Sequence, residues 1–196
     1  MSKSVRPVIV GLIVTFVTAA LLGFIGSMGG ADMGFKPALV GMIFGAFTYY
    51  IMANLAGNVK GKAATPEAKA AAVALRPEPG KAMLIVFREG FIGKAAGMNV
   101  IVDGKPRAQL KSPRFTAIPL EPGSHDLETA FGALAGKQSR ASHETFSVVA
   151  GDVVIFQAKI SMGALKNTIN VERMTPNQTI ANRFADMVMI APLDAA

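Results

Sequence analysis

The sequence predicts a two-helix transmembrane hairpin followed by an all-β antiparallel sandwich domain and a short C-terminal helix. Two long apolar runs fill the first 57 residues, and apolar residues then recur with a period of two. Turn signals separate these later segments at intervals of about ten residues, which is typical of antiparallel strands. We therefore divide the chain into an anchor (1–57), a linker (58–81), a β-domain (82–173) and a tail (174–196).

Both apolar runs are long enough to cross a membrane. They cover residues 7–28 and 37–56, and neither contains Asp, Glu, Lys, Arg or His. A bilayer core about 30 Å thick needs roughly 20 helical residues. Lys3 and Arg6 precede the first run, and further basic residues follow the second. These are Lys60, Lys62, Lys69 and Arg76. Since positive flanks stay in the cytoplasm, we expect a two-pass protein of the bacterial inner membrane with both termini cytoplasmic.

Two other topologies remain open at this point. The basic start, the apolar run and the small residues near 26–31 also fit a cleaved signal peptide. The second run would then cross from outside to inside, and the β-domain would stay cytoplasmic. If the second run does not span, the β-domain is periplasmic.

Small residues recur at every fourth position along both predicted helices. The stripes consist of Gly11, Thr15, Ala19, Gly23 and Ser27 in the first helix, and of Gly41, Gly45 and Ala53 in the second. Such stripes let helix backbones approach closely in lipid. We interpret them as closing the hairpin on itself. The alternative is that a stripe contacts another membrane protein subunit or a second copy of the chain.

The linker is rich in Ala, Lys, Gly and Pro. Thr65-Pro66-Glu67 has the pattern of an N-cap, a first-turn proline and an early acid. A short helix should therefore extend to Leu75 and end near Arg76, because Pro77 follows. A helical spacer and a mobile tether both fit this composition, and the basic residues could rest on anionic headgroups.

The β-domain is predicted to contain seven short strands and an additional last one. The expected strands are 82–88, 98–102, 105–110, 115–120, 125–131, 142–149 and 153–160, with 167–173 as the addition. Asp103-Gly104 is a strong hairpin signal. In the tail, Thr175-Pro176 predicts the start of an amphipathic helix that reaches about Met189, with Ile180, Phe184 and Val188 along one side.

The order of these strand ends and turns carries a resemblance. The motifs are Val86-Phe87-Arg88, Val100 to Lys105, Ile118 to His125, and the turn from Val148 to Asp152. Over residues 82–161 the chain resembles the PEGA-like family of small β-sandwich domains, which includes related envelope domains of unknown function. The resemblance implies a non-enzymatic accessory or binding module. Relatives are often exported and lipid-anchored, whereas this chain has no Cys. The motifs are turn and core residues, so no family binding residues carry over.

The residue inventory gives little support to catalysis or metal binding. The absence of Cys excludes disulfides, thiolate nucleophiles and cysteine-ligated metals. A zinc site needs about three ligands, and the two histidines, His125 and His143, fit ordinary strand-end positions. Asp103 and Asp152 occupy turns, where Asp favours the backbone geometry. We therefore expect no catalytic, cofactor or metal site, no cofactor, and no enzymatic activity.

The charge distribution points to a membrane surface rather than to nucleic acid. The net charge is +7, and residues 1–81 hold eight basic against three acidic side chains. Within the β-domain a group of basic residues crowds one predicted hairpin edge. This group consists of Lys105, Arg107, Lys111 and Arg114. It could contact a partner or lipid headgroups, or it could guard an exposed edge against aggregation.

These observations favour a non-catalytic, membrane-anchored accessory or scaffolding subunit of a larger membrane assembly. Its expected partners are membrane lipids and other membrane protein subunits or a second copy of the chain. The alternative is a membrane-tethered ligand-binding or sensor module. It would recognise glycan, peptide or lipid through the loops 90–97 and 132–141.

Overall fold

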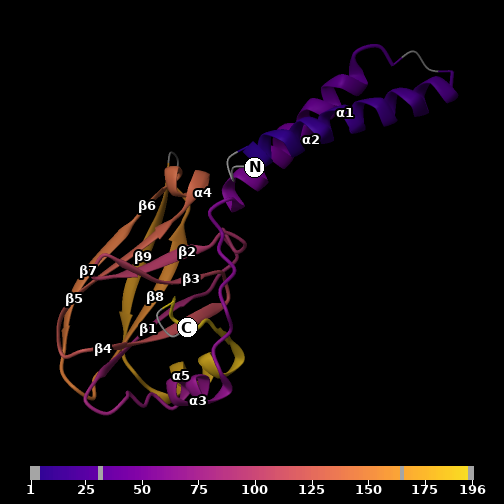
Figure 1. Cartoon of the computed structure of the whole chain (residues 1–196). Coiled ribbons are helices and arrows are strands. Elements are labelled where there is room, and N and C mark those ends of the chain that lie inside the picture. The colour runs from indigo at the N-terminus through magenta and orange to yellow at the C-terminus, as the bar shows by residue number, and fades with distance from the viewer. Residues whose placement is uncertain (1–4, 31–32, 164–165, 194–196) are drawn as a thin grey trace. The chain divides into compact units, whose positions relative to one another are not determined.

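The computed structural model describes residues 5–30, 33–163 and 166–193. The chain forms two compact units, Met1–Ala56 and Gly57–Ala196 (Figure 1). Lys3, which the topology argument uses, lies outside the described residues, as do the last three residues of the predicted tail.

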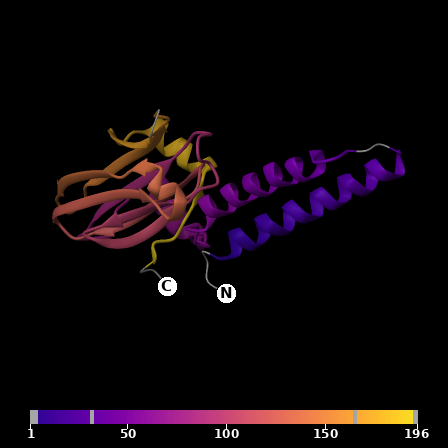
Figure 2. The same ribbon diagram turned by 90° about the horizontal axis from the view of Figure 1, so that it is seen from above.

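The first unit consists of two long apolar helices. Helix α1 spans Val5–Met28 and helix α2 spans Lys36–Leu55, which confirms both predicted helices. By length and composition, both can cross a membrane. Figure 2 shows them running side by side within their unit. Pro37 lies in the first turn of α2, where its missing N–H leaves no intrahelical hydrogen bond unmade.

The two helices approach each other most closely at glycines. A Cβ atom on Gly11 would lie 3.0 Å from the Gly45 carbonyl oxygen, and one on Gly41 would lie 2.5 Å from the Thr15 carbonyl oxygen. Ala19 also lies against Gly41. These distances leave no room for a side chain, so the two stripes meet inside the hairpin over this stretch.

The remaining stripe residues lie outside this close contact. A Cβ atom on Gly23 would meet nothing within 4 Å. The Ser27 hydroxyl donates a hydrogen bond to the Phe24 carbonyl of its own helix at 2.8 Å. Ala53, near the end of α2, is half-buried.

The outer surface of the hairpin is formed by large apolar side chains. Phe16 and Phe47 are 70% and 62% exposed, and the buried positions of both helices are only Gly and Pro residues. A water-soluble unit rarely exposes a contiguous apolar surface of this kind.

The second unit contains two β-sheets. The six-stranded sheet has the order β10-β4-β1-β8-β9-β6, and the four-stranded sheet has the order β3-β2-β5-β7. The first sheet consists of β1 (Ala82–Arg88), β4 (Arg114–Leu120), β6 (Ser139–Arg140), β8 (Val153–Ser161), β9 (Asn167–Met174) and β10 (Val188–Met189). The second consists of β2 (Met98–Val102), β3 (Lys105–Leu110), β5 (Gly123–Phe131) and β7 (Ser142–Val148). All eight expected strands are therefore present.

The expectation of purely antiparallel sheets is wrong for the larger sheet. Strand β1 pairs antiparallel with β4 but parallel with β8, with Ile85 opposite Ile155. The pairs β10–β4 and β6–β9 are also parallel. Parallel neighbours need a long connection, and the chain between β1 and β8 supplies one by building the other sheet. The four-stranded sheet is antiparallel throughout.

Strand β1 is buried on both faces. Leu84 and Val86 join a core to which both sheets contribute residues, whereas Ile85 and Phe87 face a second apolar cluster. Phe184 of helix α5 (Gln178–Asp186) belongs to that second cluster, with its ring centroid 4.9 Å from that of Phe115. Burial on two faces explains why the sequence of β1 is a continuous apolar run rather than an alternating one.

The segment expected as a linker lies within the second unit. Thr65 caps helix α3 (Pro66–Val73) by accepting a hydrogen bond from the Ala68 N–H, as its sequence predicts. Leu75 follows with a φ of 52°, a left-handed conformation that ends the helix before Pro77. Helix α3 lies beside α5 (Figure 1), and Ala64 donates its N–H to the Met189 carbonyl at 3.0 Å.

Two local expectations are corrected. The C-terminal helix begins after Asn177, whose side chain accepts from the Ile180 N–H, rather than after Thr175. It ends at Asp186, so Val188 lies in β10 and is exposed. The short parallel pairing of β10 with β4 takes up the residues that the periodicity assigned to the helix. The loop expected at 132–141 contains helix α4 (Ala133–Lys137) and strand β6.

Replacing Gly45 by Leu should separate α1 and α2, because a side chain there meets the backbone of Gly11 and the side chain of Thr15. We expect the free energy of unfolding of the hairpin to fall by about 2 kcal/mol, as for other overpacked sites. Energy transfer between labels at the open ends of the helices, followed during SDS titration, measures this change. Gly23→Leu is the matched control and should leave the titration unchanged. Equal losses in both variants would contradict the observed packing.

Candidate functional site

The four residues of the predicted basic edge are divided between the two sheets. Lys105 and Arg107 lie on β3, which forms one edge of the four-stranded sheet. Lys111 lies in the connection that follows β3. Arg114 begins β4 in the other sheet, directly opposite Arg88 of β1. Only the first two residues therefore share this edge strand, which is exposed at Lys105 and Pro106 and buried from Ala108 to Leu110.

Arg88, which ends β1, is the most unusual polar residue of the second unit. It is 1% exposed. Its Nη1 donates to the carbonyls of Ala96 at 2.6 Å and Leu110 at 3.3 Å, and its Nη2 donates to those of Ile92 at 3.2 Å and Gly93 at 2.6 Å. Burial lowers the pKa of the guanidinium to about 10, so it remains protonated at neutral pH.

The buried guanidinium organises the loop 89–97. Arg88 replaces its lost hydration with backbone carbonyls, three of which belong to this loop, and its Cζ lies 5.0 Å from the ring centroid of Phe131. The Ser112 hydroxyl adds a hydrogen bond to the Gly90 carbonyl at 2.7 Å. The loop is therefore held in one conformation although it contains three glycines.

Two amide side chains fix the first residues of the second unit to this same loop. Asn58 donates to the Ala95 carbonyl at 2.9 Å and accepts from the Gly97 N–H at 2.6 Å. Gln109 donates to the Gly57 carbonyl at 2.9 Å and accepts from the Val59 N–H at 2.6 Å. We call this set of hydrogen bonds the entry clamp, because it holds the segment that directly follows α2 in the chain.

Glycine is required at one position of the entry clamp. A Cβ atom on Gly97 would lie within 2.8 Å of Gln109 Cγ and closer still to its terminal amide. A side chain at position 97 would therefore displace Gln109 from the entry clamp.

His125 connects the hairpin turn between β2 and β3 to the segment between β4 and β5, which joins the two sheets. Its Nδ1 lies 2.8 Å from Asp103 Oδ2, and its Nε2 lies 2.8 Å from the Glu121 carbonyl oxygen. Both partners are acceptors, so both ring nitrogens must carry protons to satisfy them. Partial burial acts to lower the pKa of His125, but the hydrogen bond to Glu121 and the hydrogen bond and charge of Asp103 outweigh it and raise the pKa.

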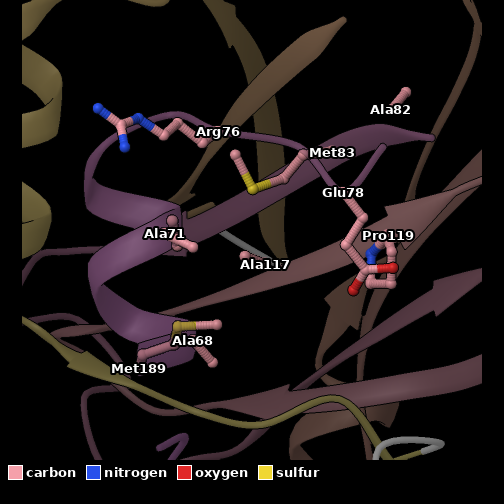
Figure 3. Close-up of a pocket in the computed structure, with 10 residues that line it drawn as sticks. Ala68, Ala71, Arg76, Glu78, Ala82, Met83, Ala117, Pro119 and Met189 are labelled. Carbon is pink, nitrogen blue, oxygen red and sulfur yellow. The ribbon is translucent and has the colours of Figure 1, made fainter. Parts of the chain in front are cut away.

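A small hollow lies between α3 and the outer face of the six-stranded sheet. Its volume is about 110 Å³. Ala68 and Ala71 of α3 lie over it, Met83 and Ala117 come from the sheet, and the charged side chains of Arg76 and Glu78 lie at its rim (Figure 3). Short alanine side chains leave this space open. It has room for one small apolar side chain of a partner.

A second, more open hollow lies beside the loop 89–97. It measures about 480 Å³ and lies between the start of the loop and the end of β8. Its lining consists of Glu89, Gly90, Phe91, Ile92, Gln157, Lys159, Ile160 and Ser161. Phe91 is its only aromatic residue. The loop 132–141, the other loop of the sensor alternative, does not line it.

Among residues 5–30, 33–163 and 166–193, no group of three or more His, Cys, Asp or Glu side chains could hold a metal ion.

A scan against protein-family models finds no match to the chain, and a search of curated proteins finds no similar sequence. The three features of the described residues that bear on function are the apolar hairpin, the entry clamp with its loop, and the edge strand β3.

Sequence reasoning missed Arg88 and the entry clamp. In the sequence, Arg88 is simply a polar residue at the end of an apolar strand. Asn58 and Gln109 are 51 positions apart in the chain. One signal was available: an arginine directly after five apolar residues and directly before a loop with three glycines. Such a loop exposes many backbone carbonyls that a guanidinium can bind.

Replacing Arg88 by Met should remove the guanidinium donor from its four carbonyl partners, of which Gly93 keeps the Ala96 N–H. We expect the free energy of unfolding of the second unit to fall by about 3 kcal/mol, and amide exchange in the loop 89–97 to accelerate. Chemical denaturation and hydrogen–deuterium exchange measure the two effects. Arg114→Met, at the paired and only half-buried position, is the control and should cost less than about 1 kcal/mol. Unchanged exchange in Arg88→Met would contradict the assigned role.

The His125–Asp103 contact predicts a dependence of stability on pH. Because the pKa of His125 is raised on folding, its contribution is fully present below the unfolded value of 6.5 and is lost as pH rises through the folded value. The wild-type chain should therefore lose more stability between about pH 6 and pH 9 than His125→Gln does. Denaturant unfolding across this range makes the comparison. Parallel pH profiles for the two proteins would show that the contact contributes nothing.

Proposed function

We propose that this chain is a non-catalytic, membrane-anchored accessory or scaffolding subunit of a larger membrane protein assembly. The observation that carries the proposal is the hairpin of α1 and α2, which has small residues at its internal contact and large apolar side chains on its outer surface. Lipid is the environment in which this arrangement is stable. The hairpin anchors the chain, and the β-rich unit is the part available to partners.

We also propose a cellular location for the chain and a fold family for its second unit. We place the chain in the bacterial inner membrane with both termini in the cytoplasm, because basic residues flank the outer ends of the hairpin. We assign the second unit to the PEGA-like sandwich type. Support comes from the apolar core to which both sheets contribute, with Val86, Val100 and Phe156 among its members.

The open edge at β3 is the partner surface that we propose. An edge strand has unpaired backbone groups along one side, onto which a strand of another protein can add. Lys105 is exposed on this strand, and Arg107 is half-buried and also acts on the carboxylate of Asp103, so the strand is basic and an acidic partner segment is favoured. Complementary charge increases both the rate and the specificity of such an association.

Affinity purification from native membranes in mild detergent tests the proposal. We expect at least one other membrane protein to co-purify in a fixed ratio. Lys105→Glu/Arg107→Glu should reduce its recovery by about tenfold, because charges along the contact would then repel. Lys166→Glu/Arg173→Glu, which alters exposed basic residues outside the four-stranded sheet, should leave recovery unchanged. Recovery of this chain alone, as a monomer, would contradict the proposed function.

A further inference from the structure

The tip of the loop 89–97 exposes two large apolar side chains next to each other. Phe91 is 88% exposed, more than any other large apolar side chain among the described residues, and Ile92 is 40% exposed. Nothing in the second unit covers Phe91, although the hollow beside it would leave room for its ring to fold back. The loop is also held firmly by Arg88 and Ser112. The exposed tip is thus a fixed feature of the loop.

The entry clamp fixes this loop to the first residues of the second unit. Gly57 follows Ala56 directly, and Asn58 is hydrogen-bonded to Ala95 and Gly97 of the loop. Tight turns connect Ala95 back to the tip, since Lys94 N–H binds the Phe91 carbonyl at 3.1 Å and Ala96 N–H binds the Gly93 carbonyl at 3.0 Å. These hydrogen bonds therefore keep the tip of the loop close to Asn58, near the beginning of the second unit.

The charges near the tip match an anionic surface. Lys94 lies within the loop and is exposed, Lys60 follows the clamped segment and is exposed, and Lys111 precedes Ser112, which binds the loop. Basic side chains around an apolar tip are the arrangement that attracts a protein to anionic headgroups while apolar groups enter the interface. Glu89 is the acidic residue of the loop, and it pairs with Arg183.

We propose that the loop 89–97 is a lipid-contacting element, in which Phe91 and Ile92 enter the interfacial layer of an anionic bilayer and Lys94 contacts its headgroups. This inference rests on the proposed membrane anchoring by α1 and α2. The loop would form a second attachment to the membrane in addition to the hairpin. It would limit the orientations that the β-rich unit can adopt at the surface.

Site-specific fluorescence on the full chain tests this inference, and the absence of Cys makes every introduced cysteine unique. Three single-cysteine variants are labelled with an environment-sensitive dye and reconstituted in vesicles of phosphatidylcholine and phosphatidylglycerol with nitroxide-bearing lipids. Phe91→Cys reports on the loop. Phe47→Cys, on the outer surface of α2, reports on the anchor. Val149→Cys, 64% exposed in the turn before β8, reports on the opposite end of β1.

The inference predicts blue-shifted emission at position 91 with stronger quenching by nitroxides near the headgroups than by nitroxides deep in the bilayer. Quenching at this position should weaken in vesicles of phosphatidylcholine alone and in a Lys94→Glu background. Position 47 should be quenched by deep nitroxides and position 149 by neither. Quenching at 47 without quenching at 91 overturns this inference alone. Loss of quenching at 47 overturns the anchoring. Equal quenching at 91 and 149 shows that the dye inserts by itself, and this also overturns the inference.

Discussion

The structure depends on the exclusion of water from the outer surface of α1 and α2. Their large apolar side chains point away from each other, since glycine and other small residues occupy the contact between the helices. The hairpin therefore has no means of burying these side chains within its own fold. The cost of exposing such a surface to water is proportional to its area, and a bilayer removes it. The β-rich unit, in contrast, buries its apolar residues in two clusters of its own.

Local patterns in the sequence predicted most elements of the fold but missed the short elements α4, β6 and β10. The apolar runs predicted both helices of the hairpin. The period of two, together with the Asp103-Gly104 turn, predicted strands of the second unit. These local patterns do not show which strands pair with each other. The run from Met83 to Phe87 indicates burial on both faces, but it does not show that β8 lies parallel beside it. Likewise, the helical periodicity of the tail extends to Val188, but Val188 pairs with Arg114 and therefore lies in strand β10.

The polar contacts of the second unit were harder to predict, because they join residues that are distant in the chain or bind backbone carbonyls. His125 looks like an ordinary strand end until Asp103 is placed beside it. Asn58 lies in a segment that composition alone describes as a linker, yet it is bonded to the loop near Ala95. Arg88 has no acidic partner that a sequence search could find, because backbone carbonyls satisfy it. Together these contacts give a segment of ordinary composition a defined position in the β-rich unit.

The orientation of the hairpin is the most direct test of the account. Single cysteines at Gly29, in the loop after α1, and at Ser124, in the exposed turn at the start of β5, can be labelled in sealed membranes with a maleimide that cannot cross the bilayer. The account predicts labelling of the Gly29→Cys chain only from outside and of the Ser124→Cys chain only from the cytoplasmic side. Labelling of both positions from the same side would contradict it.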